Sequence, residues 1–257
     1  MKNFHTHTRR CGHARGRDET YVKRAIKTGL SVLGFSDHSP MIFPSSDFRS
    51  TFRVPLSKTE DYVKSVTSLK EKYKDDIKIY LGYEMEYYPK LFNETYSYLE
   101  SFGLDYLILG QHFIYNEYED YAFHTGSSNE DLDGFDTYIE QVLTGLQTGK
   151  YLYVAHPDLY KYVGKDEDGF LRRNEYYIKE LKKLGYPVEF NLLGFYDKRN
   201  YPDCRFWEMV AKEGNDVVIG FDAHDPWVIS DMKTYNKALD YLHSLGIEPM
   251  NDKIEIK

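Results

Sequence analysis

Seven short strand-like runs recur along this chain, and each is followed within a few residues by a polar side chain that can bind a metal or a substrate. The runs are mostly apolar and rich in β-branched or aromatic residues, without the polar alternation of one-sided strands. This pattern is typical of parallel strands that are buried on both faces. The predicted strands cover residues 1–4, 31–35, 77–81, 106–109, 151–154, 188–190 and 217–221.

Helical patterns lie between these strands. Asp18 is expected to cap a helix over 19–28, and Ser57 with Glu60 forms a capping box for a second helix that reaches residue 73. Strand, loop and helix therefore recur about seven times, which favours parallel βαβ units. At 257 residues, 41% of them hydrophobic, the chain has the size of an α/β barrel that forms a single domain. The other predicted helices cover 136–147, 174–184, 202–213 and 229–245.

The polar groups that follow the strands include seven of the nine histidines. Because the carboxyl ends of parallel barrel strands meet at one face, we expect these side chains to form one site. In His5-Thr6-His7 the two imidazoles project to the same side of an extended chain, so both can reach one cation. The whole set is His5, His7, His13, Asp37, His38, Glu84, His112, His156, Asn191, Asp222 and His224.

The composition of this set favours metal ions. A lone histidine at a strand end is more often structural, but seven together favour ligands. Imidazole suits Zn, Fe and similar ions, and a carboxylate such as Glu84 can bridge two of them. With Asp222, the set exceeds what one tetrahedral ion needs. Cys11 is expected to be a small buried residue, His124 is a candidate substrate contact, and His243 is expected at the surface of the last helix.

The motifs built from these residues resemble the polymerase and histidinol phosphatase (PHP) family. The resemblance covers essentially the whole chain, in order, and the combination is very specific. Three segments are most similar to those of histidinol-phosphate phosphatases: His5-Thr-His7-Thr with Cys11-Gly-His13-Ala, Phe35-Ser-Asp-His38-Ser-Pro40, and Gly82-Tyr-Glu84-Met-Glu86-Tyr87. The other motifs are Gln111-His112, Ala155-His156-Pro157-Asp158 and Phe221-Asp222-Ala223-His224-Asp225-Pro226.

The resemblance implies an α/β fold, a distorted (β/α)7 TIM-like barrel, that forms one domain over residues 1–257 and holds three divalent ions of Zn, Fe or Mn. Glu84, Asp222 and His224 are the residues expected at the catalytic centre, where a hydroxide bridging two ions attacks the phosphorus of a phosphomonoester. The implied activity is histidinol-phosphate phosphatase, which releases L-histidinol and phosphate in histidine biosynthesis. The implied ligand sets are His5, His7, Glu84 and Asp222 for the first ion, Glu84, His112 and His156 for the second, and His13, His38 and His224 for the third.

Five further residues are expected to bind the substrate. Four are basic residues, and arginine in particular is well shaped for bidentate contact with phosphate oxygens. The fifth, Asn191, follows one of the predicted strands. Among them, the resemblance favours Lys161 and Arg199 as a clamp on the substrate. The five are Arg15, Arg17, Lys161, Asn191 and Arg199.

Other roles near the site stay open at the level of sequence. Asp37 and Asp158 adjoin ligand histidines and can orient their rings. Asp37 or Asp225 is also a candidate to protonate the leaving alkoxide. The irregular stretches 39–55 and 114–133 are candidate lids or ordinary surface insertions, and the aromatic run 113–123 forms either a wall for a flat substrate group or rim packing.

Charge and composition indicate which kinds of molecule this protein is expected to bind. The formal net charge of -8 and the absence of a basic stripe argue against long nucleic acids, so we expect a small-molecule phosphomonoester substrate. No long apolar run or signal-peptide pattern is present, which favours a cytoplasmic protein without membrane contact. Alternative functions are a PHP phosphoesterase for another small phosphate ester, a nucleotide or phosphotyrosine, and a noncatalytic metal-binding protein. An amidohydrolase-like barrel would offer a carboxylated lysine where this chain has Glu84.

Overall fold

Parallel strands arranged around a ring form the centre of the protein. The structure, a computed structural model, describes residues 1–45 and 47–256. Four strands pair in parallel in chain order: β1 (Lys2–Asn3), β2 (Val32–His38), β3 (Lys78–Glu84) and β4 (Tyr106–Ile108). Two more, β7 (Val188–Asn191) and β8 (Val217–Gly220), form a second parallel pair.

Single bridges join the two sheets into the ring. Val154 pairs in parallel with Leu109 after β4 and with Val188 of β7, and Thr6 pairs with Ala223 on the other side. The fifth predicted strand, 151–154, is therefore reduced to one bridging residue, whereas the other six runs form strands. The expected α/β fold with a distorted barrel of parallel strands in chain order is confirmed.

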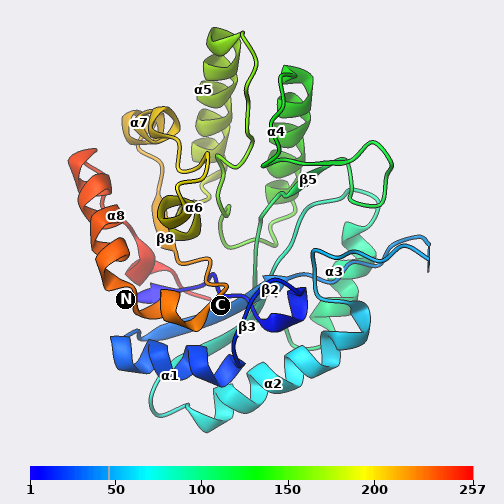
Figure 1. Cartoon of the computed structure of the whole chain (residues 1–257), viewed down its shortest axis with the longest axis vertical. Coiled ribbons are helices and arrows are strands. Elements are labelled where there is room, and N and C mark those ends of the chain that lie inside the picture. Colours follow the sequence, from blue (N-terminus) through cyan, green and yellow to red (C-terminus); the bar gives the residue numbers. More distant parts are fainter. Residues whose placement is uncertain (46, 257) are drawn as a thin grey trace.

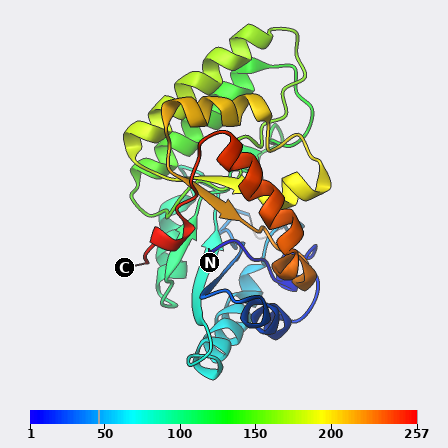
Figure 2. The ribbon, with the colours of Figure 1, turned by 90° about the vertical axis from the view of Figure 1, so that its left-hand side faces the viewer.

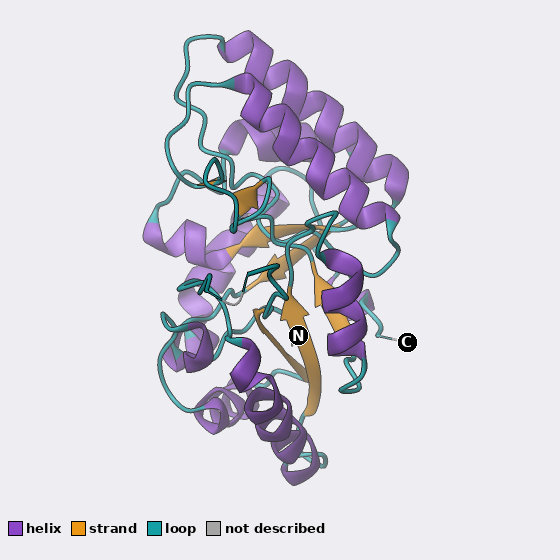
Figure 3. Ribbon diagram, turned by 90° about the vertical axis from the view of Figure 1, so that its right-hand side faces the viewer, coloured by secondary structure: helices purple, strands orange, loops and turns teal. Residues whose placement is uncertain are grey.

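Helices surround the strands. In Figure 1, α1 and α2 lie at one end of the molecule and α4 and α5 at the other, and Figure 3 shows the strands between these two groups. A short antiparallel pair, β5 (Phe113–Ile114) and β6 (Phe123–His124), follows β4. The helices are α1 (Asp18–Thr28), α2 (Thr59–Lys72), α3 (Phe92–Glu100), α4 (Leu132–Gln147), α5 (Glu167–Leu184), α6 (Leu192–Asp197), α7 (Cys204–Glu213) and α8 (Met232–Ser244), with short 3-10 turns η1 (Arg9–Cys11), η2 (Leu56–Lys58), η3 (Pro226–Ser230) and η4 (Asn251–Lys253).

Several helix starts differ from the sequence prediction. Asp18 does not cap α1; its carboxylate instead accepts hydrogen bonds from Arg10 (2.7 Å) and Ser65 (2.6 Å). The capping box at Ser57 is also wrong, because Ser57 lies in η2 and α2 begins at Thr59 without a side-chain cap. In the first case a tertiary contact outweighs the local preference. Helices α3 and α6 were not predicted, and α4 and α5 begin earlier than their apolar periodicity indicates.

The core has an inner and an outer layer. The larger cluster lies between strands and helices, as with Tyr138 and Val142 of α4. A smaller cluster draws side chains from strands all around the ring, including Phe4, Tyr80 and Tyr106, and so fills the inside of the barrel. The hydroxyl of Tyr106 donates to the carbonyl of Phe4 across it (2.7 Å). Apolar packing therefore closes the inside of the barrel on one side of the strand-end residues.

The two ends of the chain lie side by side. The amino group of Met1 lies 3.3 Å from a carboxylate oxygen of Asp252, and Lys2 donates to the carbonyl of Ile254 (2.8 Å). Figure 2 shows the C-terminal segment close to the start of β1. Among the described residues, no helix is both long and apolar enough to cross a membrane.

Candidate metal centre

The structure brings all nine predicted metal ligands together at the carboxyl ends of the strands. His38 is the last residue of β2 and Glu84 the last of β3, while His5 and His7 follow β1 and Asp222 follows β8. Eight of the nine are wholly or largely shielded from solvent, and His13 is the exposed one. Residues far apart in sequence thus converge because parallel strands end at one face.

Glu84 lies at the middle of the cluster. Its Oε2 is 3.4 Å from His5 Nε2, 3.5 Å from His7 Nε2 and 3.1 Å from His38 Nδ1. Its Oε1 is 2.7 Å from His156 Nε2 and 3.4 Å from His112 Nε2. The two carboxylate oxygens therefore face two different groups of imidazoles, the arrangement that a ligand shared by two ions requires.

Two glycines make room for buried carboxylates in this region. A Cβ on Gly110 would lie 1.9 Å from Glu84 Oε1, and a Cβ on Gly220 would lie 1.7 Å from Oε1 of Glu189. No larger residue fits at either position without displacing the carboxylate.

Asp222 is the second carboxylate of the cluster. Its Oδ1 lies 3.1 Å from His7 Nε2, 3.2 Å from His224 Nδ1 and 3.5 Å from His5 Nε2. Asp222 and His156 both have positive φ, 47° and 30°, which non-glycine residues adopt at a cost of about 1–3 kcal/mol. Such strain is concentrated at functional sites, and here it aims both side chains into the cluster.

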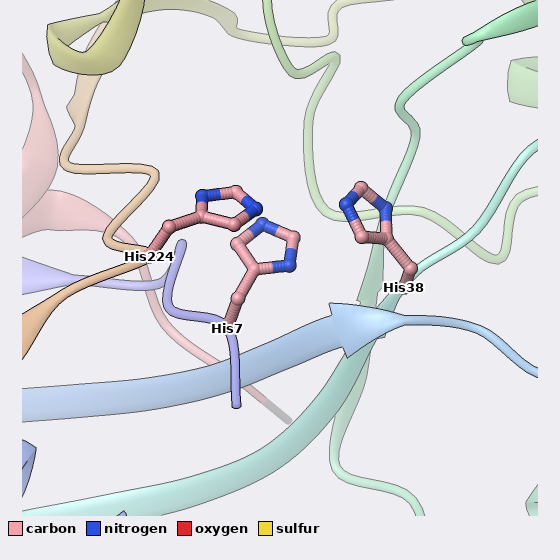
Figure 4. Close-up of side chains that lie close together, drawn as sticks. All are labelled: His7, His38 and His224. Atoms are coloured by element: carbon pink, nitrogen blue, oxygen red, sulfur yellow. The ribbon is translucent and has the colours of Figure 1, made fainter. Parts of the chain in front are cut away.

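Four imidazole rings of the cluster lie in contact, and His224 stacks on both His7 and His13. The rings of His7 and His224 are 4.0 Å apart and nearly parallel, and His38 faces them from the end of β2 with its ring 4.3 Å from that of His7 (Figure 4). The ring of His13 is 4.9 Å from that of His224 and 5.0 Å from that of His38. His7, which belongs to the first expected ligand set, therefore also lies close to residues of the third set. The partition of the ligands into three sets stays a prediction.

Several triads have the compactness that a metal ion needs, with ligand atoms within 4.8 Å of one another. His5, His7 and Asp222 form one such triad, as expected for the first ion. Cys11 also falls in two of them, one with His13 and His224 and one with His7 and Asp37, but its thiol donates to the carbonyl of Thr8. The compact groups include His7 with His38 and His224, His5 with His7 and Asp222, and His5 with Glu84 and His156.

The chemistry of this donor set fits metal ions. Buried polar atoms normally have hydrogen-bond partners, yet seven atoms of this cluster have none among the described residues. Cations would supply partners for the carboxylate oxygens and for one ring nitrogen of each imidazole. The seven are His5 Nε2, both ring nitrogens of His7, His38 Nδ1, Glu84 Oε2, His156 Nδ1 and Asp222 Oδ1.

Ionisation in the cluster is also suited to cations. Burial opposes the charge of Glu84, but the nearby imidazoles, with His112 and His5 foremost, hold its pKa well below the usual value. Burial and then the charge of His7 lower the pKa of His38 well below the usual value, so this ring is neutral. Burial also opposes a charge on His5, yet Glu189, Asp222 and Glu84 raise its pKa to about 10. Ionised carboxylates and neutral imidazoles are the forms that bind metals, and a metal would replace the proton on His5.

Two carboxylates behind the ligands were not predicted. Glu189, inside β7, lies 2.8 Å from His5 Nδ1 and accepts hydrogen bonds from the backbone of His156 (3.2 Å) and from Asn191 (2.9 Å). In the sequence, the feature that could have pointed to Glu189 is a carboxylate between two apolar residues of a predicted buried strand. Glu86 lies 3.1 Å from His112 Nδ1. Such partners fix the tautomer and direction of ligand histidines.

The two aspartates expected to orient ligand rings differ. Asp37 Oδ1 is 3.5 Å from His7 Nδ1, and its other oxygen accepts from the Thr8 hydroxyl. Asp158 instead accepts from the backbone of Asp203 (2.7 Å) and from the indole of Trp207 (3.0 Å). The expectation for Asp158 is therefore wrong, since its carboxylate anchors α7.

A cavity of about 530 Å³ opens over the ligands. Among the predicted substrate contacts, Arg15 and Arg199 line it. The Arg199 guanidinium also donates hydrogen bonds to Asp197 (2.9 Å) and to the hydroxyl of Tyr201 (3.2 Å). Phe52, from the 39–55 stretch, and His124, from the 114–133 stretch, form part of its wall. The two stretches thus border the cavity, and their function as lids stays a prediction. Ser46, in the first stretch, lies outside the described residues.

The other predicted contacts lie elsewhere. Arg17 lines a separate surface hollow beside α1, and Lys161 lines a small hollow over Asp158. Asn191 is buried below the cavity, where its amide donates to Asp222 (3.1 Å) and to Glu189. The structure therefore places Arg15 and Arg199 at the cavity and Asn191 among the supporting residues.

Comparison with known proteins agrees with this architecture. The PHP domain family profile matches residues 3–192. A probable histidinol-phosphatase of Deinococcus radiodurans is 26% identical over 86% of this chain and 85% of its own length. A probable histidinol-phosphatase of Schizosaccharomyces pombe is 26% identical over 95% of this chain and 86% of its own length.

Solved structures share the fold. A putative histidinol phosphatase from Listeria monocytogenes matches with a TM-score of 0.70 at 20% identity, over 91% of this chain and 99% of that one. Histidinol phosphate phosphatase from Lactococcus lactis, complexed with zinc, L-histidinol and phosphate, matches with a TM-score of 0.71 at 21% identity, over 97% of this chain and 95% of that one. The expected distorted TIM-like barrel is confirmed.

Proposed function

The chain belongs to the PHP domain family, and on that premise we propose that it is a metal-dependent phosphomonoester hydrolase that converts L-histidinol phosphate to L-histidinol and phosphate. The observation that carries this proposal is the position of Glu84, whose two oxygens face separate groups of imidazoles. Three of these, His38, His112 and His156, line a cavity that also has arginines on its wall. The similarity to histidinol-phosphatases over most of both chains supports the substrate.

The residues of the site are suited to a phosphate dianion. Hydrolysis of phosphate monoesters is extremely slow without a catalyst, so neutralising the charge of the phosphoryl group is the main requirement. His5, His7, Glu84 and Asp222 would hold one ion, Glu84, His112 and His156 a second, and His13, His38 and His224 a third. Bound divalent ions of Zn, Fe or Mn supply that neutralisation and lower the pKa of a water molecule to about 7.

The chain itself contributes binding and positioning. Arg15 and Arg199 line the cavity and can form bidentate contacts with phosphoryl oxygens. Asn191, buried beneath, holds Asp222 through its amide. Between the two candidate proton donors, Asp37 is fully buried behind His7, whereas Asp225 lines the cavity. A proton for the leaving alkoxide would therefore come from the Asp225 carboxyl or from solvent.

A comparison of substrates tests this function. With protein of measured metal content, kcat/KM for L-histidinol phosphate is expected to exceed that for p-nitrophenyl phosphate, phosphotyrosine and a nucleoside monophosphate by roughly 100-fold or more, the discrimination that specific polar contacts provide. A ratio near one would leave a general phosphatase. Metal binding without hydrolysis of any of these esters would identify a noncatalytic metal-binding protein.

A further inference from the structure

Among the described residues, His124 is the one histidine on the cavity wall that lies outside the expected ligand set. It ends β6, where it pairs with Phe113 of β5. Its ring centroid is 6.1 Å from that of His112, so it borders the metal centre. The side chain is partly buried and can meet a molecule in the cavity.

The position of His124 is fixed by its neighbours. The next residue, Thr125, donates from its backbone to the carbonyl of His112 (2.7 Å) and from its hydroxyl to the carbonyl of Gln111 (3.0 Å). The rings of Phe52 and Phe113 contact the imidazole edge to face, with centroids 5.6 and 5.3 Å away. His124 is thus tied to the segment that carries a predicted ligand.

One hydrogen bond sets the tautomer of His124. The backbone N–H of Gly126 donates to Nδ1 at 3.0 Å. An N–H donor needs an unprotonated acceptor, so the neutral ring carries its hydrogen on Nε2. Gly126 approaches closely here, since a Cβ would lie 3.1 Å from Cε1 and 3.2 Å from Nδ1 of the ring.

This tautomer decides what His124 can do. With its hydrogen on Nε2 and its Nδ1 lone pair engaged by Gly126, the ring has no free lone pair for a metal ion. Among the described residues, the bond from Gly126 is the one hydrogen bond that the ring makes, and Nε2 has no acceptor in the protein. The ring is therefore an uncharged donor on the cavity wall, opposite a centre whose ligands are acceptors.

We propose that His124 donates its Nε2–H to an oxygen of the phosphomonoester and so is a substrate-contacting residue outside the metal ligands. The proposal rests on the proposed function for the identity of the ester. The hydrogen bond itself does not depend on which ester is bound, because the same donor would also bind inorganic phosphate. The Arg199 guanidinium lines the same cavity, so a cation and a neutral donor would share the phosphoryl group.

Two substitutions of His124 separate hydrogen bonding from packing. His124→Phe keeps an aromatic ring against Phe52 and Phe113 but removes the donor, and His124→Gln places an amide N–H near the position of Nε2. We expect His124→Phe to raise KM for the ester and the inhibition constant of inorganic phosphate roughly 10- to 100-fold, the range for losing a hydrogen bond to a charged group. His124→Gln is expected to recover part of this loss.

Control variants define the specificity of the effect. His243→Gln changes a histidine of α8 that pairs with Glu248 (3.0 Å) away from the cavity, and it is expected to match the wild type. Gly126→Ala forces the ring of His124 to shift by a few tenths of an ångström, so an intermediate effect is expected. Bound metal per chain is expected to be unchanged in all of these variants.

Three outcomes would overturn the proposal. One is an unchanged phosphate inhibition constant in both His124 variants, which would show that His124 only packs against its neighbours and does not bind the phosphoryl group. Another is loss of bound metal in both, which would make His124 a ligand. The third is a nitrogen-15 NMR signal, absent from His124→Gln, that shows the Nδ1–H form. If the wild type ignores histidinol phosphate but phosphate inhibition of p-nitrophenyl phosphate hydrolysis still depends on His124, the proposed substrate is wrong and the assignment of His124 stands.

Discussion

Replacing Glu84 by alanine is expected to lower kcat for phosphomonoester hydrolysis on the order of 10³-fold or more. The physical reason is that one carboxylate faces both imidazole groups, so its loss removes a ligand and a negative charge from two predicted ion sites at once. Steady-state kinetics and metal analysis of the same preparation measure the effect.

The control for this prediction is Glu84→Gln, which keeps the shape of the side chain beside Gly110 but lacks the charge. It is expected to fold like the wild type and to lose both activity and bound metal. Activity of Glu84→Ala within a few-fold of the wild type, at equal metal content, would contradict the shared-ligand role.

Replacing Glu189 by leucine is expected to weaken metal binding about 10- to 100-fold and to lower the free energy of unfolding by about 3–5 kcal/mol. The carboxylate is completely buried, and its loss leaves the His5 ring and the backbone N–H of His156 without their acceptor. It also removes one of the two acceptors of the Asn191 amide. Competition with a chelator measures the affinity, and thermal denaturation of metal-free protein measures the stability.

Glu189→Gln separates the two effects. Its amide oxygen can replace one of the accepted hydrogen bonds, so stability is expected to recover more than metal affinity. Glu175→Gln, which affects only an exposed pair with Lys179, serves as the surface control. A Glu189→Leu variant with wild-type metal affinity would show that Glu189 does not position His5.

The strand-end ligands could be predicted because they depend on local pattern and one topological rule. His38 and Glu84 end strands whose apolar runs are plain in the sequence, and parallel strands bring such ends together. The length of the fifth strand was overestimated. An apolar run does not show how many of its residues pair with neighbouring strands, and in 151–154 only Val154 does.

The supporting residues could not be predicted, because their roles depend on partners far along the chain. Glu189 contacts His5 across 184 positions, and Asp158 finds Trp207 instead of the neighbouring His156. The tautomer of His124 depends instead on a near neighbour, the backbone N–H of Gly126, and no composition pattern reveals that hydrogen bond. Sequence indicates what gathers at the barrel end, and three-dimensional contacts decide how each ring is oriented.

The most direct test of the metal centre is a titration of metal-free protein with Zn, Fe or Mn in which bound ions per chain and the rate of L-histidinol phosphate hydrolysis are measured on the same samples. We predict negligible activity in the metal-free protein, a rise only as the two sets that share Glu84 fill, and a plateau at three ions per chain. Full activity without bound metal, or with a single ion per chain, would contradict it.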